Sequence, residues 1–257
     1  MKRKSGSSMP AWTSSASFDR VADRVSDCLS DGVSDGVLDR APARKQRPGP
    51  SPVNRWLLRR EAKPLLFAAA LLPLAWLLYG AIANTLGANP AEALIRGTGD
   101  WTLRFLCLTL AMTPLRQITG WHALARLRRM LGLFTFFYGV LHFLCFAWLD
   151  MGFDLTAILN DIPKRPFILV GTAALLLMLP LAATSFNAAI KALGARRWQQ
   201  LHRAVYAVAL LALLHFFWMR AAKNDFAEWS VYAAVLALLL GWRVWRKFRP
   251  APKPASA

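Results

Sequence analysis

The chain has 257 residues, of which 56% are hydrophobic, and its formal net charge at pH 7 is +18. A disordered polymer is far less apolar, and a collagen or a disulfide scaffold contains far more Gly or Cys, so these classes are excluded. The basic residues lie in clusters between long uncharged stretches, whereas a nucleic-acid-binding protein spreads them over a polar surface. The sequence therefore predicts an integral membrane protein whose partner is the lipid bilayer, not nucleic acid.

The first 52 residues differ in composition from the rest of the chain. They are rich in Ser, Asp, Gly, Pro and Arg, with too few apolar residues to offset the entropy of ordering. No apolar region follows the basic start, so the segment does not resemble a secretory signal. We expect a disordered N-terminal extension over 1–52, a transmembrane domain over 53–249 and a flexible tail over 250–257.

Six apolar stretches follow. A helix needs roughly 20 residues to cross the hydrocarbon core, and flanking Trp, Arg and Lys side chains can extend a shorter one. An open sheet would leave backbone groups unpaired in lipid. The sequence thus predicts an all-α integral membrane protein, a six-helix transmembrane bundle. Its stretches are 64–84, 101–115, 130–149, 166–183, 204–219 and 229–242.

The connecting segments alternate in charge. Segments 53–63, 116–129, 184–203 and 243–257 together hold 17 Lys and Arg residues, whereas the alternating loops hold 5. Because Lys and Arg are retained on the cytoplasmic side, this difference predicts that both termini are cytoplasmic. The chain is therefore expected to cross a membrane several times.

Two histidines lie within apolar stretches, where an ionisable side chain is costly and a functional role is the default hypothesis. His142 lies 13 residues after Arg129, and His215 lies 12 residues after Arg203. At the helical rise both rings would lie about 18–20 Å from the cytoplasmic boundary, level with each other. The alternative for each is a neutral histidine that hydrogen-bonds between helices.

Two facing imidazoles are what a bis-histidine haem requires, because each neutral ring gives a nitrogen lone pair to the iron. We therefore predict that His142 and His215 bind a b-type haem. The small residues Gly139, Ala209 and Ala212 would leave room for a porphyrin, or would serve ordinary helix packing.

His202 precedes His215 by 13 residues, about 20 Å lower and roughly 220° around a continuous helix, so the two cannot share one iron. It could be a ligand of a second haem, a partner of a flavin or an interfacial histidine. The equivalent inner position of the third stretch is Arg128 or Arg129. His122, in a basic loop, is expected to be solvated unless that loop folds back.

Three motifs carry a family resemblance. TGDWTLRFLCLTLAMTPLRQ (98–117), LRRMLGLFTFFYGVLHFL (127–144) and RWQQLHRAVYAVALLALLHF (197–216) follow in order at compatible spacing. Together with the surrounding residues 55–245 they resemble the MsrQ family, formerly YedZ, within the ferric-reductase-like transmembrane superfamily.

The resemblance implies a six-helix b-type cytochrome whose three motif histidines are His142, His202 and His215. It also implies FMN, and electron delivery to MsrP, the periplasmic molybdopterin-containing subunit that repairs oxidised methionines. The first 52 residues and His122 depart from the family pattern.

The chain shows neither a G-x-G-x-x-G dinucleotide motif nor a hydrolytic triad, and 15 residues follow the last apolar stretch. We therefore expect an electron-transfer subunit of an oxidoreductase, not a stand-alone enzyme. Its electrons would come from a cytoplasmic flavin reductase or from quinol, and would pass through flavin and haem to the periplasmic partner.

Arginines and indoles of the inner loops could bind the FMN phosphate and isoalloxazine, with Arg129, Arg197 and Trp198 as candidates. Interfacial charge would place the same residues there without a cofactor. Candidates for the haem propionates at the outer face are Arg104, Lys164, Arg165, Arg220 and Lys223.

Two alternatives stay open. One is a ferric or quinone reductase-like b-type cytochrome with another electron acceptor. The other is a transporter or scaffold with structural histidines, although intramembrane charged residues are few and no inverted repeat is visible.

Overall fold

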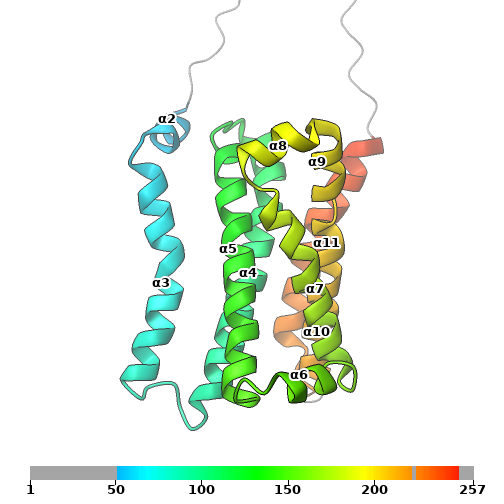
Figure 1. Ribbon diagram of the computed structural model, residues 1–257. Coiled ribbons are helices and arrows are strands. Elements are labelled where there is room, and N and C mark those ends of the chain that lie inside the picture. Colours follow the sequence, from blue (N-terminus) through cyan, green and yellow to red (C-terminus); the bar gives the residue numbers. More distant parts are fainter. Residues whose placement is uncertain (1–50, 222–223, 249–257) are drawn as a thin grey trace, which may run out of the picture. The chain divides into compact units, whose positions relative to one another are not determined.

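A computed structural model describes residues 51–221 and 224–248, and this part of the chain is helical throughout, without strands (Figure 1). The predicted all-α fold is confirmed. The predicted extension and tail lie almost entirely outside the described residues. The elements are α2 (Pro52–Leu58), α3 (Ala62–Ile82), α4 (Pro90–Thr119), α5 (Leu124–Cys145), the π-helix η1 (Phe146–Asp150), α6 (Leu155–Asp161), α7 (Pro166–Ala183), α8 (Asn187–Leu193), α9 (Ala195–His202), α10 (Val205–Ala221) and α11 (Ala227–Phe248).

Five segments of the described chain are long and apolar enough to cross a membrane, one fewer than predicted. They are built on α3, α5 with η1, α7, α9 with α10, and α11. The predicted span that is not among them, 101–115, lies in α4, which is 30 residues long. Asp100 and Arg104 lower its hydropathy, so its length would suffice for a span but its composition does not mark it as one.

The helices bury few side chains and expose many apolar ones. Trp76 is 73% exposed, Ile82 83% and Leu238 74%. In water such surfaces would aggregate, but in a bilayer they face hydrocarbon. Together with the five apolar helices, this surface identifies a multi-pass membrane protein.

Two helix pairs form the centre of the bundle. The most extensive contacts join α4 to α5 and α7 to α10, and α11 packs on α4 and α10. The main core lies where these helices meet, and its most deeply buried members are Leu106, Leu110, Val208, Ala209 and Leu236.

α3 contacts α4 and α5 through an apolar cluster around Ala70 and through one polar contact. An open apolar groove of about 940 Å³, lined by residues such as Trp76 and Phe105, lies between α3, α4 and α5. The fully buried Tyr138 of α5 donates its hydroxyl hydrogen to the Ala70 carbonyl at 2.9 Å and accepts the Leu74 N–H at 3.1 Å. These two groups would bond directly in a regular helix, and they flank Pro73, which interrupts the ladder.

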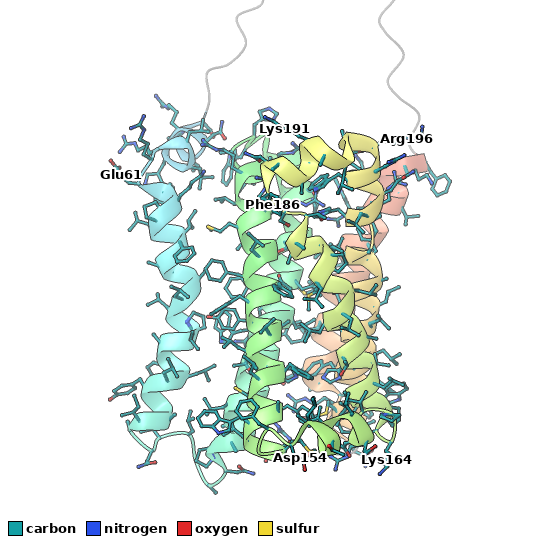
Figure 2. All side chains as sticks on the ribbon, viewed as in Figure 1. Glu61, Asp154, Lys164, Phe186, Lys191 and Arg196 are labelled. Atoms are coloured by element: carbon teal, nitrogen blue, oxygen red, sulfur yellow. The ribbon has the colours of Figure 1, made fainter. Side chains whose placement is uncertain are left out.

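The basic segments gather at one end of the bundle. The α2 end, the α4–α5 turn, α8, α9 and the end of α11 lie together, whereas α6 lies at the opposite end (Figure 1). Figure 2 shows Lys191 and Arg196 at the first end and Asp154 and Lys164 at the second. For the residues that the structure describes, the charge difference read from the sequence is therefore a difference between the two ends of the folded bundle.

Candidate functional site

His142 of α5 is held against α4. Its Nδ1 lies 2.8 Å from the Ile95 carbonyl oxygen. One turn further along α4, Gly99 allows the ring to approach, because a Cβ there would lie 3.0 Å from both Nδ1 and Cε1 of the imidazole. The ring therefore lies against a surface made of backbone.

His215 of α10 is held against α7 in the same way. Its Nδ1 lies 2.6 Å from the Phe167 carbonyl oxygen. A Cβ at Gly171 would lie 2.8 Å from Nδ1 and 2.9 Å from Cε1 of this ring. Real Cβ atoms essentially never show separations below 3.0 Å, so the ring can occupy this position only beside glycine.

The sites of the two histidines have the same arrangement. In each, the glycine lies four residues after the accepting carbonyl. The carbonyl precedes its histidine by 47 residues at the His142 site and by 48 residues at the His215 site. The α4–α5 and α7–α10 pairs thus present two imidazoles through equivalent backbone features.

The hydrogen bonds define the protonation of both rings. A carbonyl oxygen can only accept, so each neutral imidazole carries its proton on Nδ1 and keeps the lone pair of Nε2. The structure brings the two rings together, with their centroids 6.0 Å apart and their planes at 80°. Two such rings can offer two nitrogen lone pairs to one centre.

The small residues considered beside the histidines pack helices together. A Cβ at Gly139 would lie 3.0 Å from Met178 Cε and 3.5 Å from Leu175 Cδ1, so this glycine faces α7. Ala209 is fully buried in the main core. The glycines that contact the histidines, Gly99 and Gly171, were missed by sequence reasoning. The available signal was a poor helix former inside an apolar helix.

His202 belongs to a separate cluster. It ends α9, and a turn at residues 203–204 separates it from α10, so the continuous helix assumed for its position is broken. Its ring stacks on Trp198 with centroids 4.0 Å apart, and its Nε2 lies 3.1 Å from the Thr184 hydroxyl. Trp198 donates its indole N–H to the Thr184 carbonyl at 2.9 Å.

The arginine candidates at the basic end are only partly gathered around this cluster. Arg128 and Arg129 act electrostatically on His202, and the guanidinium of Arg129 donates to the Asn187 side chain at 2.8 Å. Arg197 is exposed on α9. His122 is also exposed, in the turn before α5, as expected for a solvated loop residue.

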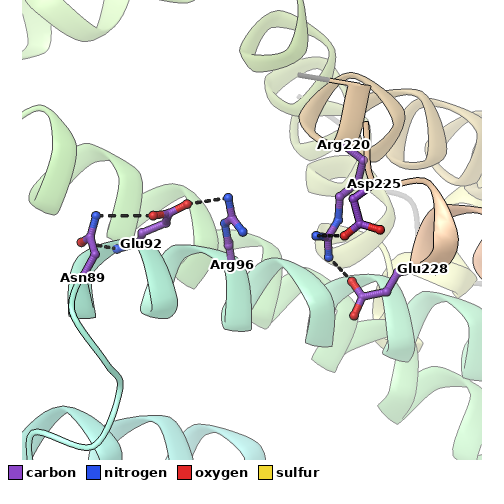
Figure 3. A network of polar contacts seen from close by, with 6 residues as sticks. All are labelled: Asn89, Glu92, Arg96, Arg220, Asp225 and Glu228. Atoms are coloured by element: carbon purple, nitrogen blue, oxygen red, sulfur yellow. Dashed lines mark hydrogen bonds and ion pairs between the residues drawn. The ribbon is translucent and has the colours of Figure 1, made fainter. Parts of the chain in front are cut away.

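Charged side chains at the opposite end are paired with one another (Figure 3). Arg220 bridges Asp225 at 3.2 Å and also Glu228. Arg96 pairs with Glu92 at 2.5 Å.

The other propionate candidates vary in their surroundings. The guanidinium of Arg104 lies 4.7 Å above the ring of Trp101 and donates to the Tyr232 hydroxyl at 3.2 Å. Arg165 pairs with Asp161 at 3.0 Å. Lys223 lies outside the described residues. Arg104, Arg165 and Arg220 thus have protein partners.

The helical membrane fold with two paired imidazoles defines a class of protein, that of multi-pass membrane components that carry a histidine pair between helices. Residues 98–213 match the family described as "Ferric reductase like transmembrane component". The matched range includes His142 and His202 and ends two residues before His215.

Curated relatives identify the family more closely. A protein of Polaromonas naphthalenivorans, named protein-methionine-sulfoxide reductase heme-binding subunit MsrQ, is 65% identical over 79% of this chain and 93% of its own. Relatives of the same name from Ralstonia nicotianae and Bordetella pertussis are 53% and 58% identical, over 77% and 72% of this chain and 91% of each relative. The chain belongs to the MsrQ family. No solved structure matches it significantly.

Proposed function

We propose that this protein is the haem-binding, electron-transferring membrane subunit of a methionine-sulfoxide reductase system, in which His142 and His215 would hold a b-type haem. The observation that carries the proposal is the pair of imidazoles with centroids 6.0 Å apart, each held by a backbone carbonyl. The names of the curated relatives support the haem and the reaction.

The two imidazoles fit a b-type haem. Two metal–imidazole bonds of about 2 Å each, together with the radii of the two rings, separate the centroids of a bis-histidine pair by about 6 Å. In the described part of the chain, no three His, Cys, Asp or Glu side chains gather where they could hold a metal ion. A group that brings its own equatorial nitrogens therefore suits these two imidazoles better than a bare metal ion.

The protein's own residues would hold and tune this group. When bound, a b-type haem would supply a one-electron carrier inside the membrane. The carbonyls of Ile95 and Phe167 keep the proton of each imidazole on Nδ1 and raise the basicity of Nε2.

We further propose the direction of electron flow. The basic end of the bundle would face the cytoplasm of a bacterium whose inner membrane holds the protein, with both termini on that side. Electrons would enter there from a flavin reductase or from quinol, and would leave at the opposite end toward a periplasmic MsrP-like molybdoenzyme. The alternation of charge between the two ends supports this orientation.

The cluster at the basic end is the proposed FMN site. Trp198 and His202 form a stacked aromatic pair, and Arg128 and Arg129 provide positive charge for a phosphate. Arg197 is exposed nearby on α9, where it could reach a phosphate at the surface. His202 would then serve the flavin and not the haem between α5 and α10.

The test is a reduced-minus-oxidised absorption spectrum of the purified, detergent-solubilised protein. We expect a low-spin b-type signature that is lost in His142→Ala and in His215→Ala. Loss of a residue that would bind the iron should lower haem affinity by more than the 10–100-fold typical of changes to residues that only contact such a ligand. His122→Ala, in an exposed turn, is the matched control and should leave the spectrum unchanged. A wild-type spectrum in both ligand variants would contradict the assignment.

A further inference from the structure

Both proposed ligands lie against glycine, and the space that each glycine leaves is filled by the Nδ1–Cε1 edge of the imidazole. We propose that Gly99 and Gly171 are positioning residues that fix the orientation and basicity of His142 and His215 as haem ligands. The inference rests on the proposed function, since it concerns how these two rings bind iron. It adds two residues, on α4 and α7, that do not themselves touch the metal.

The first step of the argument is steric. A Cβ at Gly171 would lie 2.8 Å from Nδ1, and one at Gly99 would lie 3.0 Å from Nδ1 and Cε1. An alanine at either position would therefore push the ring away from its helix. The displacement would weaken the bond of 2.8 Å from His142 to the Ile95 carbonyl, or that of 2.6 Å from His215 to the Phe167 carbonyl.

The second step separates these glycines from ordinary packing glycines. Gly97, two residues before Gly99, is also tightly surrounded, because a Cβ there would lie 2.6 Å from Leu77 Cδ2. That neighbour is the free end of a flexible side chain and can rotate away. The imidazoles are held by a hydrogen bond, and as iron ligands they would also be held by the metal, so they cannot move without a change at the haem.

The third step concerns the electronic effect. An Nδ1–H that donates to a carbonyl makes Nε2 a stronger donor, which stabilises the oxidised iron and lowers the midpoint potential. Weakening of this bond should raise the potential. A ring that is also pushed out of position should bind more weakly, so part of the haem should change from low spin to high spin.

A substitution at Thr98 should shift the midpoint potential in the opposite direction. Its hydroxyl lies 2.8 Å from the Leu94 carbonyl and 2.9 Å from the Ile95 carbonyl, so it competes with His142 for the same acceptor. Replacing Thr98 with the isosteric Val removes the competing donor without adding bulk beside Gly99. The His142 bond should then strengthen, and the midpoint potential should fall.

The experiment compares the full-length variants Gly99→Ala, Gly171→Ala and Thr98→Val, with Gly97→Ala and Gly132→Ala as controls. At Gly132 a Cβ would make only an ordinary contact of 3.7 Å with Thr109. Haem content, the low-spin fraction from electron paramagnetic resonance and the midpoint potential from a redox titration are measured for each variant. These readouts do not depend on turnover.

We expect Gly99→Ala and Gly171→Ala to lose at least half of the low-spin signal per protein and to titrate at a higher potential. The larger loss is expected for Gly171→Ala, where the clearance is smaller. Both controls should match the wild type, and Thr98→Val should titrate lower. If a glycine variant is recovered too poorly to titrate, the sign of the Thr98→Val shift decides, and no shift or an upward shift overturns the inference.

Failure of the inference and failure of the proposed function give different results. If His142→Ala and His215→Ala lose the haem while both glycine variants keep the wild-type spectrum and potential, the ligand assignment stands and the positioning role is wrong. If the histidine variants keep the haem, the proposed ligand pair itself is wrong. Equal losses in Gly97→Ala and Gly99→Ala would also overturn the inference, since they would reflect general packing.

Discussion

Replacing Tyr138 with Phe tests how α3 is attached to the rest of the bundle. The substitution removes one oxygen atom from a fully buried side chain and leaves the ring in place. The ring packs on Phe105 with centroids 5.2 Å apart, so the apolar packing is unchanged. What is lost is the pair of hydrogen bonds to Ala70 and Leu74 of α3.

The structure sets the size of the expected effect. A hydrogen bond contributes about 0.5–1.5 kcal/mol net in water-soluble proteins. Interhelical bonds in a membrane protein average about 0.6 kcal/mol. Because two bonds are lost, and because the freed backbone groups of Ala70 and Leu74 can partly pair with each other, we expect a loss of about 1–2 kcal/mol of unfolding free energy.

Reversible unfolding in mixed detergent micelles, combined with hydrogen exchange of the Leu74 amide, measures this effect. Tyr79→Phe is the matched control, because this tyrosine lies on α3 with 62% of its surface exposed. Pro73→Ala should reduce the cost of Tyr138→Phe, because a regular backbone ladder can then satisfy the same groups. An unchanged unfolding free energy together with unchanged Leu74 exchange would refute the attachment role of the hydroxyl.

Further predictions concern the two ends of the bundle. Trp198→Leu removes the ring that stacks on His202 and should lower the flavin content several-fold without loss of haem, as measured by fluorescence of acid-released flavin; Trp76→Leu, at an exposed position of α3, is the control. Equal flavin in both variants would contradict the FMN site. Arg220→Gln breaks two ion pairs whose acidic partners are largely exposed, so we expect a stability loss below about 1 kcal/mol by detergent unfolding; a loss of several kcal/mol would show that the pairs hold α10 to α11. A reporter that works only in the cytoplasm should be active when fused at Lys191 and inactive when fused at Asp154. A reporter that works only outside the cytoplasm should show the opposite pattern, and reversal of both results would refute the orientation.

Features that depend on hydropathy and local rise could be predicted from the sequence. The stretch 166–183 coincides with α7, and 64–84 is shifted from α3 by two residues. The spacing of His142 and His215 from the basic boundary predicted two rings at one depth, and the structure brings these two rings together. Each of these inferences needs only the composition of one helix.

Features that depend on which helices pair could not be predicted in this way. Gly99 and Gly171 contact imidazoles that lie 43 and 44 residues further along the chain, and no pattern within one helix indicates that contact. α4 begins at Pro90, capped by Asn89, eleven residues before the apolar stretch that was predicted as a span. Its first three turns carry charged residues that hydropathy does not assign to a transmembrane helix.

The break before α10 is a second example. Sequence reasoning treated the helix as continuous through Arg203, but the chain turns at residues 203–204 and starts α10 at Val205. Backbone bonds from Arg203 to Gln200 and from Ala204 to Leu201 tighten this turn. As a result of this break, His202 lies at the end of α9, beside Thr184 and Trp198.

The most direct test of the central claim asks whether two histidines suffice. In the double variant His122→Ala/His202→Ala, His142 and His215 are the only histidines left in the chain. Electron paramagnetic resonance of the oxidised, purified protein should still show a low-spin bis-histidine haem. A signal that disappears in this variant, or that changes to high spin, would contradict the assignment of an iron shared between α5 and α10.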